Sequence, residues 1–244
     1  MPKPRPTEQQ RTRARERIEG RLRAFGGDAR VIEVLRVGGG SRPDVAVVSM
    51  DGAECVVKDH LGCDRWFGRL LGPMLSRREA DALRRLHGLE GVPRLLRVFD
   101  RRAFAMSLLD GEPYRGRSLP VEEWRRFFDA MQRLVDDMHA RGVAHCDLRS
   151  PDNTLITGQG MPAVVDFVAS YTRGSRMKPW SGWLFAKLCA VDISAIEKQK
   201  RTVCRELVVD AAAAEHGAGK GRLDRAGRRF GVTVRRIARR LFTG

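Results

Sequence analysis

Several features that mark other classes of protein are scarce or missing in this sequence. No run of about eighteen apolar residues occurs, so we expect no membrane-spanning helix. The five cysteines form no C-x-x-C pair, which argues against a zinc knuckle. Aromatic residues make up only 7% of the chain and no recognised motif accompanies them, so we do not expect nucleic-acid binding. The residues after Met1 are prolines and charges rather than an apolar signal region, and we expect a cytosolic protein with reduced thiols.

Acidic residues are also in deficit. The chain has 30 Asp and Glu against 46 Lys and Arg, a formal net charge of +16. Such a surface attracts polyanions, but the charge does not choose among them. Near the C-terminus, a helix would align apolar residues between arginines, a pattern typical of a helix lying on anionic lipid and equally of a docked final helix with a solvated basic face. We expect peripheral contact with the inner face of a membrane. The aligned residues are Val234, Ile237, Ala238 and Leu241.

The first half of the chain is rich in short β-type runs. Three follow one another with tight connections, and two more surround an Asp100-Arg101 turn. A helix capped by Ser76 separates the two groups. This order predicts a five-stranded antiparallel sheet. The predicted strands are 31–37, 44–50, 54–59, 94–99 and 103–109, and the predicted helix is 77–86.

The second half is mainly helical. A long helix with an apolar stripe at 121–141 is followed by a polar loop, a hairpin of 154–156 and 163–165, and a helix from about Trp180. Together the two halves predict an α+β protein of two lobes. We expect the first segment to be a mobile or loosely docked arm, because its apolar stripe is thin. The predicted divisions are a basic arm at 1–28, an N-lobe at 29–110, a C-lobe at 111–216 and a basic tail at 217–244.

Two positions in the first half suit the binding of phosphate. Lys58 ends an apolar strand, where a buried charge needs a partner. Glu79 on the following helix can be that partner. A lysine at a strand end pointing into solvent, with Glu79 on a polar helix face, is the alternative.

The second half offers acids and amides at structured places. In the loop between the long helix and the hairpin, Asp147 can accept a proton, Asn153 can give an amide oxygen to Mg²⁺, and Arg149 can steady a transferred phosphate. Asp166 follows an apolar strand and suits a carboxylate that grips a metal. Polar turns with side-chain capping are the alternative for both places.

Taken together, these segments resemble the protein-kinase signature set. Cys55-Val56-Val57-Lys58 resembles the strand of the ATP lysine, the run from His145 to Asn153 resembles the catalytic loop, and Asp166-Phe167-Val168 resembles D-F-G. The resemblance covers about residues 31–191 in the correct order. It implies a two-lobed protein-kinase-like fold that uses ATP and Mg²⁺. By this resemblance the catalytic residues are Asp147, Lys58, Glu79 and Arg149, and the metal ligands are Asn153 and Asp166.

The same resemblance places adenine between the lobes. The glycine loop would approach phosphate, although it matches G-x-G-x-x-G only loosely and a mobile turn explains it equally well. Linker residues would hydrogen-bond to adenine through their backbone. The implied nucleotide-binding residues are Lys58, Val57, Gly38, Gly39, Gly40, Met106, Ser107, Leu108 and Leu109.

Three departures from the signature narrow the likeness. Asn153 stands one place later than the usual motif requires, so Asp152 is a reserve candidate, and Val168 replaces the D-F-G glycine. No A-P-E motif or long activation segment follows Asp166. In this last respect, and in the runs 77–83, 91–95 and 190–193, the chain is similar to compact bacterial lipopolysaccharide kinases, which phosphorylate Kdo or heptose sugars, and to RIO-type atypical kinases. In that likeness Asp192 braces the catalytic loop, and a helix cap is its alternative role.

Three functions remain open from the sequence. The favoured one transfers the γ-phosphate of ATP to a hydroxyl, with a sugar of lipopolysaccharide core or a similar glycolipid as acceptor. The alternative is a RIO-like protein serine/threonine kinase that uses the same residues. A pseudokinase that only binds partners is the third; the departures favour it, whereas the joint presence of the lysine, its glutamate and the site carboxylates argues against it.

Overall fold

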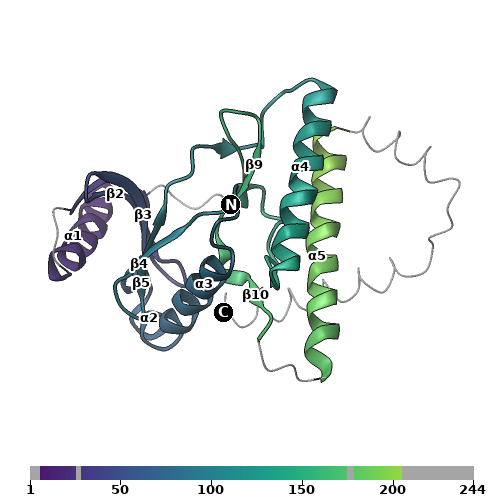
Figure 1. The fold of residues 1–244 in the computed structure, drawn as a ribbon. Coiled ribbons are helices and arrows are strands. Elements are labelled where there is room, and N and C mark those ends of the chain that lie inside the picture. Colours follow the sequence, from purple (N-terminus) through teal and green to yellow (C-terminus); the bar gives the residue numbers. More distant parts are fainter. Residues whose placement is uncertain (1–5, 26–28, 175–178, 205–244) are drawn as a thin grey trace, which may run out of the picture. The chain divides into compact units, whose positions relative to one another are not determined.

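The protein is an α+β fold in two compact units, shown in Figure 1. The computed structural model describes residues 6–25, 29–174 and 179–204. The first unit comprises Met1–His87 and Pro93–Leu108, and the second comprises Gly88–Val92 and Leu109–Gly244. The change of unit after Leu108 lies close to the predicted junction at residue 110. The predicted N-lobe limits were incomplete, because Gly88–Val92 belongs to the second unit.

A five-stranded sheet forms the centre of the first unit. Every pairing in it is antiparallel, so the predicted sheet is confirmed. Between the second and third strands the chain turns at Asp51-Gly52, where both residues have positive φ (52° and 79°), as an Asp-Gly hairpin turn requires. In the order β1-β2-β3-β5-β4, the sheet is built from β1 (Ala29–Arg36), β2 (Asp44–Met50), β3 (Ala53–Asp59), β4 (Leu95–Val98) and β5 (Ala103–Ser107).

The helix between β3 and β4 starts earlier than predicted. A 3-10 turn, η1 (His60–Gly62), and a short helix, α2 (Arg65–Leu70), precede α3 (Gly72–Arg85). Ser76 is buried inside α3, so its predicted role as the cap is wrong. Pro73 stands in the first turn of α3, where its missing N–H costs no hydrogen bond.

The predicted loosely docked arm is a packed helix, and that prediction is wrong. Residues Glu8–Ala24 form α1, which begins with a capping box at Thr7 and lies against β1 and β2 (Figure 1). Ala14, Ile18 and Leu22 are at most 2% exposed and share one apolar cluster with buried residues of the sheet. Their spacing of one helical turn makes a narrow stripe sufficient for docking.

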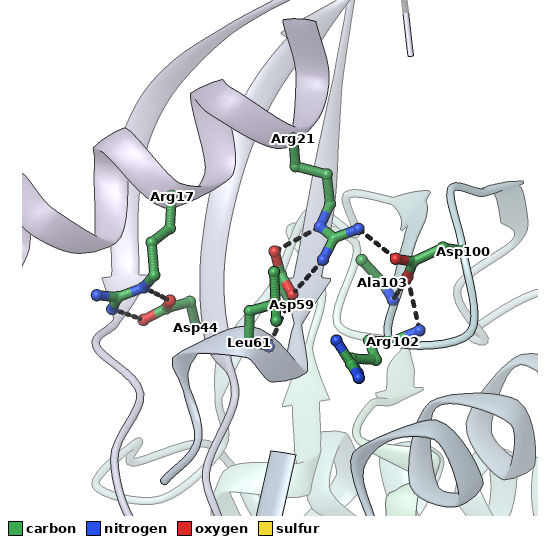
Figure 2. A network of polar contacts seen from close by, with 8 residues as sticks. All are labelled: Arg17, Arg21, Asp44, Asp59, Leu61, Asp100, Arg102 and Ala103. Atoms are coloured by element: carbon green, nitrogen blue, oxygen red, sulfur yellow. Dashed lines mark hydrogen bonds and ion pairs between the residues drawn. The ribbon is translucent and has the colours of Figure 1, made fainter. Parts of the chain in front are cut away.

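Arginines of α1 form the second part of this contact (Figure 2). Arg21 donates from Nε and Nη2 to the Asp59 carboxylate at 2.6 and 3.2 Å, and from Nη1 to Asp100 at 2.7 Å. Arg17 donates from Nε and Nη2 to both carboxylate oxygens of Asp44, at 2.8 and 3.0 Å. The helix is therefore tied to the start of β2, the end of β3 and the turn between β4 and β5.

Two helices and short strands form the second unit. Within it, α4 (Val121–Ala140) and α5 (Pro179–Val203) lie side by side (Figure 1). A three-stranded sheet has the order β6-β8-β9, and β10 pairs with β7. The remaining elements are β6 (Glu112–Pro113), β7 (Val143–Ala144), η2 (Pro151–Asn153), β8 (Thr154–Ile156), β9 (Pro162–Val164), η3 (Phe167–Ala169) and β10 (Tyr171–Thr172).

The core of the second unit follows the predicted stripe of α4. All seven stripe residues are buried: Trp124, Phe127, Phe128, Met131, Leu134, Val135 and Met138. Because α5 already begins at Pro179, the predicted absence of a long activation segment is confirmed. The predicted basic tail and its interfacial helix at 234–241 lie outside the described residues. In the part of the chain that the structure describes, no helix has the length and apolar character needed to cross a membrane.

Candidate active site

The first unit contains the predicted lysine–glutamate pair. Lys58 Nζ lies 2.5 Å from Glu79 Oε1, and the two side chains are 5% and 1% exposed. Glu79 reaches this position because it stands on the buried face of α3. A buried charge needs a partner of this kind, so the solvent-facing alternative is excluded.

Strand alternation separates Lys58 from Val57. Val57 is fully buried in the apolar cluster that includes α1, whereas Val56 shares the face of Lys58. This packing is at odds with a nucleotide contact by Val57 and favours Val56, one residue earlier. The sequence contained the signal, because residues on one face of a strand are two apart.

The glycine loop is a tight turn, and hydrogen bonds donated by its backbone N–H groups hold it in place. Gly38 N donates to Asp44 Oδ1 at 2.7 Å, Gly39 N to the carbonyl of Arg42 at 3.1 Å, and Gly40 N to Asp64 Oδ1 at 2.9 Å. A Cβ on Gly38 would lie 2.5 Å from the backbone of Gly62, so glycine is required there. Phosphate contacts by these three N–H groups would need the two carboxylates to release Gly38 and Gly40, and the Arg42 carbonyl to release Gly39.

Among the predicted adenine contacts, two residues are built into the sheet. Met106 is buried in β5, and Ser107 N donates to the carbonyl of Arg94 at 2.8 Å. The Ser107 hydroxyl in turn accepts from Arg94 N at 2.9 Å. Leu108 and Leu109 follow the end of β5.

In the second unit, the catalytic-loop segment is braced from α5. The carboxylate of Asp192, which is fully buried, accepts from His145 N at 2.7 Å and from Cys146 N at 2.8 Å. His139 Nε2 lies 3.0 Å from the same carboxylate. The predicted bracing role of Asp192 is therefore confirmed. Cys146 has φ of 67°, a costly conformation for a side-chain-bearing residue, and strain of this kind is concentrated at functional sites.

The ring of His145 joins the two predicted segments. Its Nδ1 accepts from Asp147 N at 3.3 Å, so Nε2 carries the proton that it donates to the carbonyl of Val165 at 3.0 Å. The ring also packs on Phe167, with centroids 4.7 Å apart. Sequence reasoning missed this link, since nothing in the spacing shows that the ring spans from one segment to the other.

Asp147 and Asn153 are in direct contact. Asn153 Nδ2 donates to the carbonyl of Asp147 at 3.1 Å and to its Oδ2 at 3.2 Å. Asn153 O accepts from Val165 N at 3.0 Å, which places this loop beside the backbone that leads into Asp166. Asp152 is exposed, so the structure favours Asn153 over the reserve candidate. The 3-10 turn η2 absorbs the additional residue.

These side chains offer oxygen to a metal. Asp166 stands in the left-handed region, with φ 68° and ψ 69°, directly after the strand and before η3. Since Asn153 donates through Nδ2, its Oδ1 is the atom suited to a cation. Among the described residues there is no cluster of three or more His, Cys, Asp or Glu that could hold a metal. Mg²⁺ typically uses one or two carboxylates, waters and substrate phosphates, so this set fits Mg²⁺ that arrives with a nucleotide.

Arg149 is directed toward α5. Its Nη2 donates to Ser194 Oγ at 3.3 Å. Gln199, also on α5, donates to the carbonyl of Leu148 at 2.5 Å. Gln199 had not been predicted as a site residue, because its contact with the loop bridges 51 positions in sequence.

Comparison with known proteins points to one fold. No family model matches the chain, and no curated protein matches it. Among solved structures it is similar to the Rio2 kinase of Chaetomium thermophilum. The complex of that kinase with ADP/Mg²⁺ and phosphoaspartate is 18% identical, with a TM-score of 0.51, over 70% of this chain and 56% of that chain. A second structure of the kinase is 20% identical, with a TM-score of 0.52, over 71% and 58%.

The chain thus spans a little more than half the length of the Rio2 kinase structures. Likeness at this level of identity establishes the fold, which is protein-kinase-like and similar to that of a RIO-type atypical kinase. The fold prediction is confirmed.

Proposed function

We propose that this chain is an ATP-dependent phosphotransferase that moves the γ-phosphate to a hydroxyl group. The observation that carries the proposal is the direct contact of Asn153 with Asp147, on a loop that Asp192 braces. The buried pair of Lys58 and Glu79 supports it independently.

The residues divide the chemistry as follows. A bond forms between the acceptor oxygen and the γ-phosphorus, the bond from that phosphorus to the β–γ bridging oxygen breaks, and ADP leaves. Asp147 receives the proton of the acceptor hydroxyl. Lys58, oriented by Glu79, supports the phosphates of ATP. Asn153 and Asp166 would hold Mg²⁺, and when bound this ion supplies positive charge that offsets the charge of the phosphates.

For adenine, we propose Val56 and the backbone of residues 108 and 109. Val56 lies on the face of Lys58, and the two leucines follow β5. The glycine loop would let its backbone come close to the nucleotide without donating hydrogen bonds to it. The N–H groups of Gly38 and Gly40 already donate to Asp44 and Asp64.

The likeness to Rio2 kinase supports a RIO-like kinase better than a lipopolysaccharide-sugar kinase. A protein hydroxyl is accordingly the first acceptor to test, and a sugar hydroxyl of a glycolipid is the second. Both use the same residues.

Calorimetric titration with ADP, with and without Mg²⁺, tests the nucleotide site. We expect Mg²⁺ to tighten ADP binding to the wild-type chain. Asp166→Asn should lose most of that Mg²⁺ dependence, whereas Asp152→Asn, an exposed acid of the neighbouring loop, should keep it. Absence of ADP binding, or equal Mg²⁺ dependence in all three proteins, would overturn the assignment.

A further inference from the structure

A half-open cavity of about 410 Å³ lies in the second unit, and its lining includes residues of the loop that follows Asp147. Its walls come from three places: the segment after β6, the catalytic loop, and the last turns of α5. The lining residues are Tyr114, Arg115, Gly116, Arg117, Arg149, Pro151, Ala195, Lys198, Gln199, Thr202 and Val203. This volume accommodates a small molecule, or one polar group of a larger one.

Charge in the cavity is of one sign. Among the described residues that line it, four are cationic and none is acidic. Arg117 is paired with Glu112 outside the lining. Arg115 and Lys198 are both exposed, one on each side of the cavity, and Arg149 lies between them in sequence and is half-buried. Cations that face one space without an acid create a local field that concentrates anions.

Two of the lining residues each have a buried polar atom with unused hydrogen-bonding capacity. Arg149 Nε and Gln199 Oε1 are both buried and have no hydrogen-bond partner in the part of the chain that the structure describes. One is a donor and the other an acceptor. A buried polar atom without a partner costs about 1–3 kcal/mol, so a native protein usually supplies a partner through a ligand or an ordered water.

The remaining atoms of these two side chains fix their place. Arg149 is held by Ser194, and Gln199 donates to the carbonyl of Leu148 and to Thr154 Oγ1. The cavity wall is therefore anchored to the residues that directly follow Asp147. A group bound here lies next to the loop that carries Asp147, the residue proposed to receive the proton of the acceptor.

We propose that this cavity binds a phosphate group carried by the acceptor. A phosphate monoester has a charge of about −1.5 to −2 at neutral pH and three acceptor oxygens, which match guanidinium and ammonium donors. When singly protonated, it also has an O–H that can donate to Gln199 Oε1. The acceptor role rests on the proposed phosphotransferase function, whereas the binding of phosphate does not.

Binding is tested first, without ATP. The full chain is titrated at constant ionic strength with inorganic phosphate, with glucose 1-phosphate, and with vesicles containing phosphatidate. The variants are Arg115→Gln and Lys198→Gln, and the matched control is Arg201→Gln, which removes an exposed charge from α5 outside the cavity. We expect saturable phosphate binding that weakens roughly tenfold in each cavity variant and stays unchanged in the control.

The three probes distinguish the source of the phosphate group. Tighter binding of glucose 1-phosphate than of inorganic phosphate supports a soluble phosphorylated acceptor, and tighter binding of vesicles supports a lipid headgroup. Absence of saturable binding overturns the proposal, because ordered water would then be the partner of the two buried polar atoms. Equal weakening in Arg201→Gln also overturns it, because diffuse attraction to a basic surface would then account for the binding.

The acceptor role is tested by transfer to glucose 1-phosphate, the probe that has both a phosphate and free hydroxyl groups. We expect Lys198→Gln to raise KM for the phosphorylated acceptor by about tenfold while kcat stays near the wild-type value. Phosphate binding without any ATP turnover would sink the proposed function and keep the anion site. ATP turnover by the wild-type chain with an unchanged KM for the phosphorylated acceptor in Lys198→Gln would keep the proposed function and overturn the acceptor role of the cavity.

Discussion

Substituting Arg21 with methionine tests whether α1 is a structural part of the first unit. Methionine keeps most of the volume and the apolar stem but removes the guanidinium. The Asp59 side chain is then left buried, at 0% exposure, without its cation. Loss of one partner from a buried pair typically costs about 3–5 kcal/mol. Asp100 is 38% exposed, so its share is small and lies within that range.

Urea denaturation followed by circular dichroism measures this change. With an m-value of about 2 kcal/mol per M, the expected loss corresponds to a midpoint lower by roughly 2 M. Arg23→Met is the matched control, because Arg23 lies on the same helix, is 75% exposed and pairs with Glu19 only at 3.8 Å. That control should change stability by less than about 1 kcal/mol.

The double variant Arg21→Met/Asp59→Asn isolates the cause. Burial raises the pKa of Asp59, and the hydrogen bonds and charge of Arg21 act in the opposite direction. Removing both charges should therefore recover part of the lost stability, since no uncompensated carboxylate is left. If Arg21→Met is no more destabilising than Arg23→Met, or if the double variant is less stable than Arg21→Met, the reasoning about the buried pair is refuted.

Three further predictions concern the site and the acid limb of stability. Lys58→Met should lower the free energy of unfolding by about 3–5 kcal/mol in urea denaturation, because it leaves Glu79 buried without its cation. The double variant Lys58→Met/Glu79→Gln should recover part of the lost stability. A Lys58→Met variant as stable as wild type would contradict the buried pair. Asp192→Asn should lower kcat at unchanged KM for ATP in steady-state assays, since it weakens two backbone contacts of the loop; a change in KM alone would argue against bracing. Burial opposes the charged form of Asp100, but the backbone N–H of Arg102 and the Arg21 guanidinium outweigh burial and lower the pKa of Asp100. The stabilisation that Asp100 contributes is therefore fully present above the unfolded pKa of about 3.9. It is lost as the pH falls through the lower pKa of the folded state. Asp100→Asn should flatten the fall of the urea midpoint below about pH 4, and an unchanged acid limb would refute this.

Short-range patterns were sufficient for most of the fold. The strands were predicted because alternation and the Asp51-Gly52 turn are local signals, and α4 because its apolar stripe extends over about four turns of helix, from Trp124 to Met138. The loop of Asp147 and Asn153 could be located for the same reason, because both residues lie within one segment and a 3-10 turn brings them together. Asp192 was assigned correctly through the family resemblance, not through spacing.

Features that depend on distant partners were not predicted. The docking of α1 needs Asp44, Asp59 and Asp100, whose pairing with Arg17 and Arg21 cannot be read from a thin stripe. The hydrogen bonds from the glycine loop to Asp44 and Asp64 were not predicted for the same reason, since these partners lie outside the loop. The predicted nucleotide residue Val57 packs in the apolar cluster that includes α1, and strand alternation alone already separates it from Val56 and Lys58. Gln199 and the cavity that it lines come together only in the folded second unit.

Transfer of labelled γ-phosphate from ATP by the purified full chain tests the central claim most directly. The acceptors are a generic protein and a glycolipid, each with and without Mg²⁺. We predict Mg²⁺-dependent transfer by the wild-type chain, a loss of roughly 10²–10⁴-fold in Asp147→Asn, and near wild-type transfer in Asp152→Asn, which lies on the same loop but outside the contact with Asn153. Equal transfer by the two variants, or no transfer by the wild-type chain, would contradict the account.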